Sequence, residues 1–415
     1  MKIIFRDIID DLRRFLNSDE ILLLTGARQA GKTSILRFLQ DELNEKKAKT
    51  FFLNFEDPDY LRLINQSPKN LFKIFPINLK ERTFVFIDEV QYLKNPTNFL
   101  KYFYDEYQGK IKIIASGSSA FYLDKKFKDS LVGRKLIFPV RTLSFREFLR
   151  FKGEEELIES LPKKFSLQNY HLVKKISLSE IEKIENLYFE FLLYGGYPRV
   201  VLAPLSDKTL LLQDIAYSYI KKDVYEAEIR QDEFFYRLLK ILAGQIGNLV
   251  NVNELSSTLG ISRKAITNYL YVMQKSFHIL LLKPFYKNFR KELTKMPKVY
   301  FYDTGLRNFL INNFEPLLNR QDRGEILENA VMRQLAERAG ILTEEKIKFW
   351  RYRTGAEVDF IFEEKIAFEV KFDAHSFKKS KYSLFMEKYP GINFNLVSFS
   401  DEPKIELPIW KPWLL

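Results

Sequence analysis

The stretch Gly26-Ala27-Arg28-Gln29-Ala30-Gly31-Lys32-Thr33 decides how the first part of the chain folds. It fits the pattern G-x-x-x-x-G-K-[ST] of phosphate-binding loops. An apolar run, residues 21–25, precedes it and predicts a buried strand. A stretch with Ile35, Leu36 and Leu39 on one helical face follows it. This strand–loop–helix setting directs backbone N–H groups and a helix N-terminus at a phosphate group.

The side chains of this loop have separate expected roles. Gly26 and Gly31 let backbone N–H groups turn toward the ligand. Lys32 reaches the β- and γ-phosphates of ATP, and the Thr33 hydroxyl binds Mg²⁺. A turn that happens to be rich in glycine is the alternative, which the flanking strand and helix disfavour. The predicted nucleotide contacts are Gly26, Ala27, Arg28, Gln29, Ala30, Gly31, Lys32, Thr33 and Ser34.

The chain has 415 residues, no cysteine and a formal net charge of +12. This length suggests about two to four domains of roughly 100–200 residues each. The basic balance favours an acidic partner such as nucleic acid or a membrane surface. Absence of cysteine excludes a disulfide framework and fits an intracellular protein, for which we expect a cytoplasmic location. The N-terminus shows no signal-peptide core, and no apolar run approaches about 20 residues, so we expect no membrane span.

Two acidic residues follow a second buried run. Four apolar residues, 84–87, lead into Asp88 and Glu89, which is the Walker B pattern. Asp88 is then delivered to the Mg²⁺ beside Thr33, and Glu89 orients and deprotonates the attacking water. Helical stretches between the strands imply βαβ units and a parallel sheet. Further strands are expected at residues 50–55, 112–115 and 136–140.

Two residues near strand ends are candidates for sensing the γ-phosphate. Ser116 follows the strand 112–115, although a plain turn serine is an equal alternative. Arg134 precedes the strand 136–140 and suits an arginine finger or a γ-phosphate sensor. A surface arginine is the alternative for Arg134. With the phosphate loop and the Walker B acids, these residues predict an ATPase.

Motifs that go beyond this core occur along most of the sequence, at residues 86–91, 116–119, 142–148, 194–199, 297–306 and 324–329. Together with the phosphate loop they resemble the archaeal and bacterial AAA-type, STAND-like ATPases that are often described only as ATP-binding proteins. The resemblance covers nearly the whole chain and implies an α/β fold. It implies a P-loop AAA-type core with a parallel sheet (1–143), a helical lid (144–232), a winged helix (233–305) and a C-terminal restriction-endonuclease-like α/β domain of the PD-(D/E)XK class (306–415).

The middle of the chain, residues 144–232, has helical periodicity with Phe145 and Phe148 on one face. The run Gly195-Gly196-Tyr197-Pro198 interrupts this pattern, and Arg199 stands at the start of a new helix. By the resemblance this segment is the lid, and Arg199 reaches back to the nucleotide as a second sensor. A purely structural arginine is equally compatible with the sequence.

Residues 251–262 predict the beginning of a helix-turn-helix. Asn251 or Asn253 caps the first helix, Gly260 ends it and Ser262 caps the second helix. Strands at 280–285 and 298–302 then supply a wing. Its predicted basic tip consists of Lys287, Arg290, Lys291, Lys295 and Lys298.

DNA contact is the predicted role of this region, with the second helix in the major groove and the wing on phosphates. Protein packing is the alternative, because a fold alone does not fix a function. The predicted DNA contacts are Arg263, Lys264, Thr267, Asn268, Lys291 and Lys295.

A charged hairpin is predicted near the C-terminus, with strands at 357–362 and 366–372. Side chains alternate along a strand, so Glu369 and Lys371 share one face, where Asp359 of the partner strand meets them. An Asp followed by Glu-x-Lys on a hairpin is the PD-(D/E)XK arrangement. A charged hairpin without chemistry is the alternative.

In that arrangement Asp359 and Glu369 hold Mg²⁺ or Mn²⁺, and Lys371 steadies the attacking hydroxide or the charge of the transition state. The resemblance adds a helix acid, Glu328 or Glu325, to the metal shell.

The combined prediction is an ATPase that binds ATP and Mg²⁺ and couples them to DNA binding, with a nuclease-like C-terminal domain. We expect no membrane partner, and a homo-oligomer in which Arg134 acts across a subunit interface is compatible with the sequence. One alternative is a Mg²⁺-dependent, structure-specific DNA endonuclease gated by ATP, and another is a signalling ATPase that binds protein partners.

Overall fold

The chain forms two compact units. The first consists of Met1–Thr142, Lys222–Ile229 and Lys275–Phe277, and the second of Leu143–Lys221, Arg230–Gln274 and His278–Leu415. The computed structural model describes residues 3–117, 131–159, 161, 176–286, 295–340, 343–352 and 355–415. The first unit thus contains the predicted P-loop core, whereas most of the other three predicted domains lie in the second unit.

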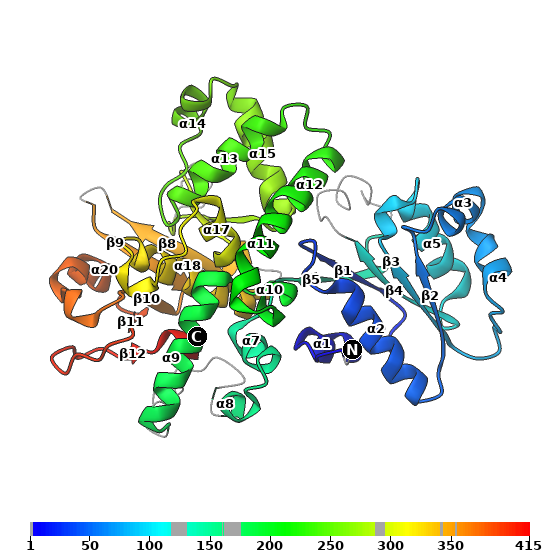
Figure 1. Ribbon diagram of the computed structural model, residues 1–415, viewed down its shortest axis with the longest axis horizontal. Helices are drawn as coiled ribbons and strands as arrows, with labels where there is room; N and C mark the ends of the chain where they lie inside the picture. The colour runs from blue at the N-terminus through cyan, green and yellow to red at the C-terminus, as the bar shows by residue number, and fades with distance from the viewer. Residues whose placement is uncertain are drawn as a thin grey trace. The chain divides into compact units, whose positions relative to one another are not determined.

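A five-stranded parallel sheet forms the centre of the first unit (Figure 1). Its strands follow the order β2-β3-β4-β1-β5, so β1 lies between β4 and β5, and β4 lies between β1 and β3. The carboxyl ends of β1, β3 and β4 therefore meet at one edge. The strands are β1 (Ile21–Gly26), β2 (Lys49–Asn54), β3 (Thr83–Asp88), β4 (Ile111–Gly117) and β5 (Lys135–Val140).

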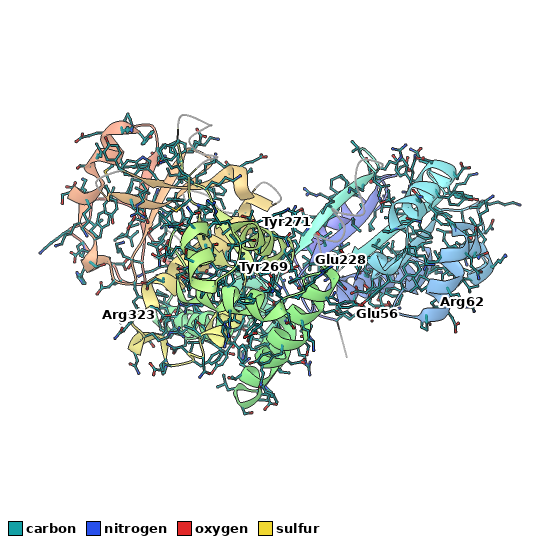
Figure 2. The ribbon with its side chains drawn as sticks, turned by 90° about the horizontal axis from the view of Figure 1, so that it is seen from above. Glu56, Arg62, Glu228, Tyr269, Tyr271 and Arg323 are labelled. Atoms are coloured by element: carbon teal, nitrogen blue, oxygen red, sulfur yellow. The ribbon has the colours of Figure 1, made fainter. Side chains whose placement is uncertain are left out.

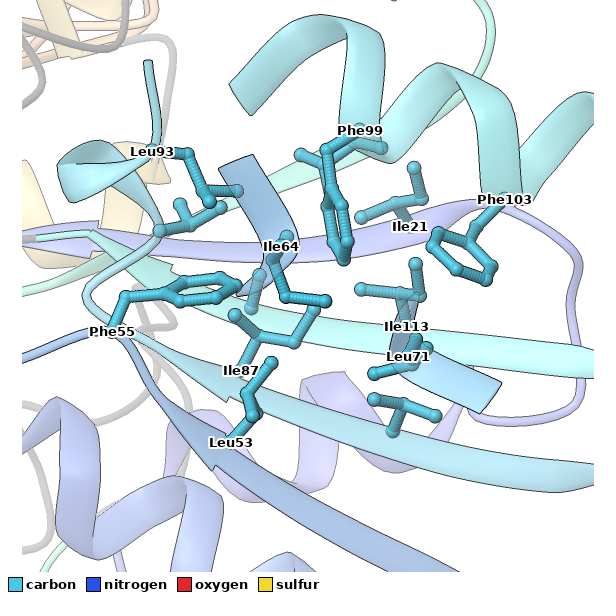
Figure 3. Packing of buried hydrophobic residues seen from close by; sticks show 14 of the residues in the cluster. Ile21, Leu53, Phe55, Ile64, Leu71, Ile87, Leu93, Phe99, Phe103 and Ile113 are labelled. Carbon is cyan, nitrogen blue, oxygen red and sulfur yellow. The ribbon is translucent and has the colours of Figure 1, made fainter. Parts of the chain in front are cut away.

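Helices cover both faces of this sheet, because most of the alternating side chains of its central strands are apolar. One face packs against α1 (Ile8–Arg13) and α2 (Lys32–Glu45). The other face packs against α3 (Pro58–Gln66), α4 (Leu71–Ile74) and α5 (Pro96–Tyr107), where Phe99 and Phe103 reach the strand residues (Figure 3). Short 3₁₀ turns lie at Pro68–Asn70 and Val90–Tyr92. The predicted α/β fold with a parallel sheet is confirmed for this unit.

The first half of the second unit is helical, as the periodicity predicted. Phe145 and Phe148 are both buried, and α7 and α9 each begin with a capping box, at Ser144 and Ser177. The elements are α7 (Phe145–Phe151), α8 (Glu155–Glu159), α9 (Leu178–Tyr194), α10 (Pro198–Leu202), α11 (Leu205–Asp214), a π-helical turn (Ile215–Tyr219) and α13 (Asp232–Gly244). Between the π-helical turn and α13 lies α12 (Ile220–Glu226), whose residues from Lys222 onward belong to the first unit.

A helix–turn–helix follows, made of α14 (Val252–Leu259) and α15 (Arg263–Lys275). Asn251 caps α14 by accepting hydrogen bonds from two backbone N–H groups, which settles the alternative with Asn253. Gly260 ends the helix with φ of 66°, a left-handed conformation that glycine adopts without strain. The two antiparallel strands after α15 are β6 (Ile279–Leu282) and β7 (Lys298–Phe301).

A mixed sheet of order β12-β11-β10-β9-β8 organises the C-terminal part. Here β9 runs antiparallel to both neighbours, while β10, β11 and β12 are mutually parallel. The predicted hairpin is confirmed as β9 and β10. The strands are β8 (Ile347–Arg351), β9 (Glu357–Phe362), β10 (Ile366–Val370), β11 (Asn393–Val397) and β12 (Ile409–Trp410). The helices are α17 (Thr304–Leu310), α18 (Arg323–Ala339), α19 (Thr343–Lys346) and α20 (Ser383–Lys388), with 3₁₀ turns at Leu317–Asn319, Ala374–Ser376, Lys379–Tyr382 and Pro412–Leu414.

Within the part of the chain that the structure describes, no helix has both the length and the apolar character that crossing a bilayer requires.

Candidate functional site

The phosphate loop connects β1 to α2 at the carboxyl edge of the parallel sheet. Gly31 caps α2 with φ of 95°, a left-handed conformation that favours glycine. Gly26 pairs with Val140 of β5, and a Cβ at position 26 would overlap the Val140 carbonyl oxygen. Both glycines of the motif are therefore required by the backbone itself, before any ligand is considered.

Lys32 is turned back onto the loop. Its ammonium donates hydrogen bonds to the carbonyl oxygens of Gly26 (3.0 Å) and Ala27 (2.9 Å), and only 5% of the residue is exposed. Burial lowers the pKa of Lys32 to about 8, although the charges of Glu89 and Asp88 act in the opposite direction. Among the described residues, the hydrogen-bond partners of this buried ammonium are carbonyl oxygens, which makes it well suited to receive an anionic phosphate.

Three residues from separate segments of the sequence converge beside this lysine. The Thr33 hydroxyl donates to Oδ2 of Asp88 over 2.6 Å, and the Ser116 hydroxyl donates to Oδ1 of the same carboxylate. The Glu89 backbone N–H donates to Ser116 Oγ over 3.3 Å. The structure thus brings the ends of β1, β3 and β4 together as the sequence predicted, with Ser116 fully buried against Asp88.

Glu89 lies directly after β3 in a left-handed backbone conformation, with φ of 57°. This conformation is uncommon for a residue with a side chain, and such strain clusters at functional sites. The Glu89 carboxylate accepts a hydrogen bond from the Gln91 side-chain amide. The position after the strand, next to Asp88 and Ser116, is the one that the Walker B pattern assigns to the water-activating acid.

The predicted nuclease residues lie together in the second unit. In the antiparallel pair of β9 and β10, Phe360 lies opposite Phe368. The next position along this register places Asp359 beside Glu369. Glu369 accepts hydrogen bonds from Lys371 and from the Tyr382 hydroxyl (2.7 Å).

Hydrogen bonding and burial fix the surroundings of the two carboxyl groups, Asp359 and Glu369. Asp359 Oδ2 accepts the Val370 N–H over 2.9 Å. Burial, and then the charge of Asp359, raise the pKa of Glu369 to about 8. Oε2 of Glu369 is buried with no hydrogen-bond partner among the described residues.

A lysine from another strand lies among the remaining acids. Lys298 Nζ is 3.1 Å from Glu328 Oε1, 2.5 Å from Glu357 Oε1 and 3.8 Å from Asp359 Oδ1. The Tyr300 hydroxyl also donates to Glu328 Oε1, over 2.6 Å. Burial, and then the charge of Asp359, raise the pKa of Glu328 to about 7.

These residues do not fit a divalent ion in this arrangement. Over the residues that the structure describes, no three or more His, Asp or Glu side chains are placed to hold a metal ion. Of the two helix acids that the sequence offered, Glu328 lies in the cluster, whereas Glu325 is exposed. Glu369 Oε2 offers an unsatisfied ligand atom, but the neighbouring acids already have a cation, Lys298.

The outer face of α15 is exposed as predicted. Arg263, Lys264, Thr267 and Asn268 all lie on the surface, whereas Ile266 and Tyr269 are buried. Figure 2 labels Tyr269 and Tyr271, which lie two residues apart on α15.

The predicted basic tip needs one correction. Lys295 is exposed, and Lys287, Arg290 and Lys291 lie outside the described residues. Lys298 does not belong to the tip, because it is the first residue of β7 and is buried against Glu328 and Glu357.

A sequence model of the AAA domain family matches residues 18–149. The chain contains an AAA-type ATP-binding domain. Two families described as domains of unknown function, DUF8612 and DUF4143, match residues 185–317 and 323–399. The geometry of Lys32, Thr33 and Asp88 therefore belongs to the AAA domain.

Similar proteins extend the comparison over nearly the whole chain. An uncharacterized protein of Methanocaldococcus jannaschii is 28% identical over 97% of this chain and 86% of its own length. One of Haemophilus influenzae is 25% identical over 88% of this chain and 87% of its own.

Solved structures are more distant. C. elegans PCH-2 has a TM-score of 0.34 and 16% identity over 52% of this chain and 64% of that chain. AMPPCP-bound DnaA from Aquifex aeolicus has a TM-score of 0.28 and 14% identity, over 65% of this chain and 86% of that chain. TM-scores this low carry no argument about function.

The two predicted arginine sensors, Arg134 and Arg199, belong to different units of the structure. Arg134 precedes β5, at the sheet edge opposite to the phosphate loop of the AAA domain, and forms an ion pair with Asp105 (2.7 Å). Within its own unit Arg134 therefore lies away from the phosphate loop, and its role as an arginine finger across a subunit interface stays a prediction. Arg199 begins α10 in the second unit and forms an ion pair with Asp214 (3.3 Å). Ser118 and Ser119 lie outside the described residues.

The AAA domain also contains contacts that the sequence did not reveal. Arg28 of the phosphate loop is buried and forms ion pairs with Asp223 (3.1 Å) and Glu226, both on α12. Burial by itself lowers the pKa of Arg28, but these two carboxylates raise it above its usual range. Arg6 donates to the carbonyl oxygen of Ala30 over 2.8 Å. No local pattern links Arg28 to acids 195 and 198 residues away.

Proposed function

We propose that the protein hydrolyses ATP in its AAA domain and couples the nucleotide state to DNA binding through α15. The convergence of Lys32, Thr33, Asp88 and Ser116 at the ends of three adjacent strands carries the first half of this proposal. Each of these residue types has a defined task in phosphoryl transfer. The second half is supported by the exposed polar and basic face of α15.

The residues divide the reaction among them. Backbone N–H groups of the loop and the Lys32 ammonium hold the β- and γ-phosphates of ATP. Thr33 and Asp88 are the residues that would hold Mg²⁺, which supplies neutralising charge to the phosphates. Glu89 accepts the proton of the attacking water as its oxygen bonds to the γ-phosphorus. The bond between the γ-phosphorus and the bridging oxygen breaks, which releases ADP and phosphate.

Steady-state hydrolysis assays test the proposed ATP hydrolysis by the AAA domain. Asp88→Asn removes one charge from the predicted Mg²⁺ ligand and should lower the turnover number at least about 100-fold, the scale seen when one preorganised charge is lost. Asp41→Asn is the matched control, because Asp41 is exposed on α2 and should leave turnover unchanged. Equal turnover by the Asp88 variant and the wild type would refute the assignment.

The salt dependence of DNA affinity tests the proposed DNA binding through α15. Each phosphate contact adds about 0.9 to the slope of log affinity against log salt concentration. Replacing Arg263 and Lys264 by Ala should therefore lower the slope by about 1.8. Replacing the exposed AAA-domain residues Lys80 and Lys94 by Ala is the control and should leave the slope unchanged. An equal slope for wild type and the α15 variant would place DNA binding elsewhere.

The two alternative functions, an endonuclease and a signalling ATPase, place different demands on the protein. The endonuclease needs a divalent ion among Glu328, Asp359 and Glu369, where the structure has Lys298 instead. DNA cleavage is therefore not part of the proposed function. The signalling ATPase that binds protein partners differs in one measurable respect, because its ATP hydrolysis does not respond to DNA.

A further inference from the structure

Lys298 is the most completely surrounded cation of the acidic cluster. It is 2% exposed, and its ammonium lies within 4 Å of three carboxylates, one from α18 and two from β9. These carboxylates come from two separate elements, so the ammonium lies between them and not beside a single partner.

The acids of the cluster also have other partners, although Oε2 of Glu369 has none among the described residues. A lysine ammonium has three N–H donors, and Lys298 faces three acids. Glu328 accepts a further hydrogen bond from Tyr300, and Asp359 accepts one from the Val370 N–H. Glu369 has its own cation, Lys371. The acidic residues of the predicted metal site thus have lysine partners on both sides.

A divalent ion makes demands that conflict with this arrangement. Mg²⁺ needs about six oxygen ligands at roughly 2.0–2.1 Å in near-octahedral geometry. An ammonium in hydrogen-bond contact with Glu328 and Glu357, and close to Asp359, occupies the space between them and repels a second cation. Metal entry therefore requires Lys298 to leave a position in which it is almost fully buried.

We propose that Lys298 is the resident cation of this cluster and takes the place of the divalent ion. The C-terminal domain then keeps its acids as an internal ion-pair network, and it does not bind Mg²⁺ or Mn²⁺ for DNA cleavage. This inference concerns the second unit only. It does not depend on ATP hydrolysis, and its test uses no nucleotide.

Electron paramagnetic resonance counts bound Mn²⁺ in the nucleotide-free full chain. The wild type should show no Mn²⁺ that depends on Asp359. Lys298→Met removes the charge at similar length and should create one Mn²⁺ site, which a second substitution, Asp359→Asn, should abolish. Lys295→Met is the control, because Lys295 is exposed and close in sequence, and it should behave as the wild type.

Two results would overturn the proposal. One is a wild-type Mn²⁺ site that disappears in Asp359→Asn, and the other is a folded Lys298→Met protein that gains no Mn²⁺ site. Lys298→Met leaves three acids without their cation, so it can fail to fold. In that event Lys298→Arg decides, since it keeps the charge. A folded Arg variant without Mn²⁺ supports the proposal, whereas one that binds Mn²⁺ through Asp359 refutes it.

Discussion

Raising the pH above about 8 should weaken ATP binding through Lys32. Burial lowers the pKa of this ammonium to about 8 in the nucleotide-free protein. The phosphates of ATP favour the charged form, so the pKa of Lys32 rises in the complex. Below the pKa of the free protein the lysine is already charged, and binding takes up no proton. Above it, each binding event takes up one proton, so affinity falls as pH rises.

The size of the effect follows from this linkage. The fraction of charged Lys32 falls about tenfold between roughly pH 7 and pH 9, so the dissociation constant should rise about tenfold, or about 1.4 kcal/mol. Titration calorimetry with a non-hydrolysable ATP analogue, in buffers of different ionisation enthalpy, measures both affinity and proton uptake. At about pH 9 the uptake should approach one proton per site.

Lys32→Arg provides the matched control, because a guanidinium stays charged over this range. Its affinity should be independent of pH even where its absolute affinity is lower. A wild-type protein that takes up no proton at about pH 9 would refute the reasoning. The same conclusion would follow if the Lys and Arg proteins showed equal pH dependence.

Three further predictions concern the AAA domain. Glu89→Gln should keep ATP affinity within about threefold but lower turnover by about 100-fold or more, which binding and steady-state assays separate. A mixture of Arg134→Ala and Lys32→Ala proteins should regain hydrolysis that neither shows alone, because each supplies the part that the other lacks; a mixture with no added activity would exclude action between subunits. Gly26→Ala should lower stability by about 1–3 kcal/mol in chemical denaturation, because its methyl group would overlap the Val140 carbonyl oxygen.

Local patterns were sufficient to predict the phosphate loop, the Walker B acids and the C-terminal hairpin. In each case the decisive residues lie within a few positions of one another, and the flanking apolar residues fix which way they point. The convergence of Thr33, Asp88 and Ser116 was also predictable, because parallel strands end at a common edge. The individual hydrogen bonds that Ser116 makes were not.

The failures involve partners that are distant in sequence. Lys298 appeared to belong to an exposed basic tip, because several lysines precede it in the sequence. Its side chain instead meets Glu328 of α18 and Glu357 of β9, 30 and 59 residues away. The ion-pair partners of a lysine on a strand depend on which acids the tertiary structure places beside it. A single sequence does not reveal these partners. The partners of Arg28 escaped prediction for the same reason.

The first unit, which contains the AAA domain, includes Lys222–Ile229 in addition to Met1–Thr142, so it is built from segments that are separate in the sequence. A fragment that ends at residue 149, where the AAA family match ends, contains Arg28 but neither Asp223 nor Glu226. Loss of a partner from a buried ion pair costs about 3–5 kcal/mol, against a total stability of about 5–15 kcal/mol for a typical domain. Excision at the apparent domain boundary therefore damages the phosphate loop itself. We therefore expect a stable nucleotide-binding fragment to extend at least to residue 229.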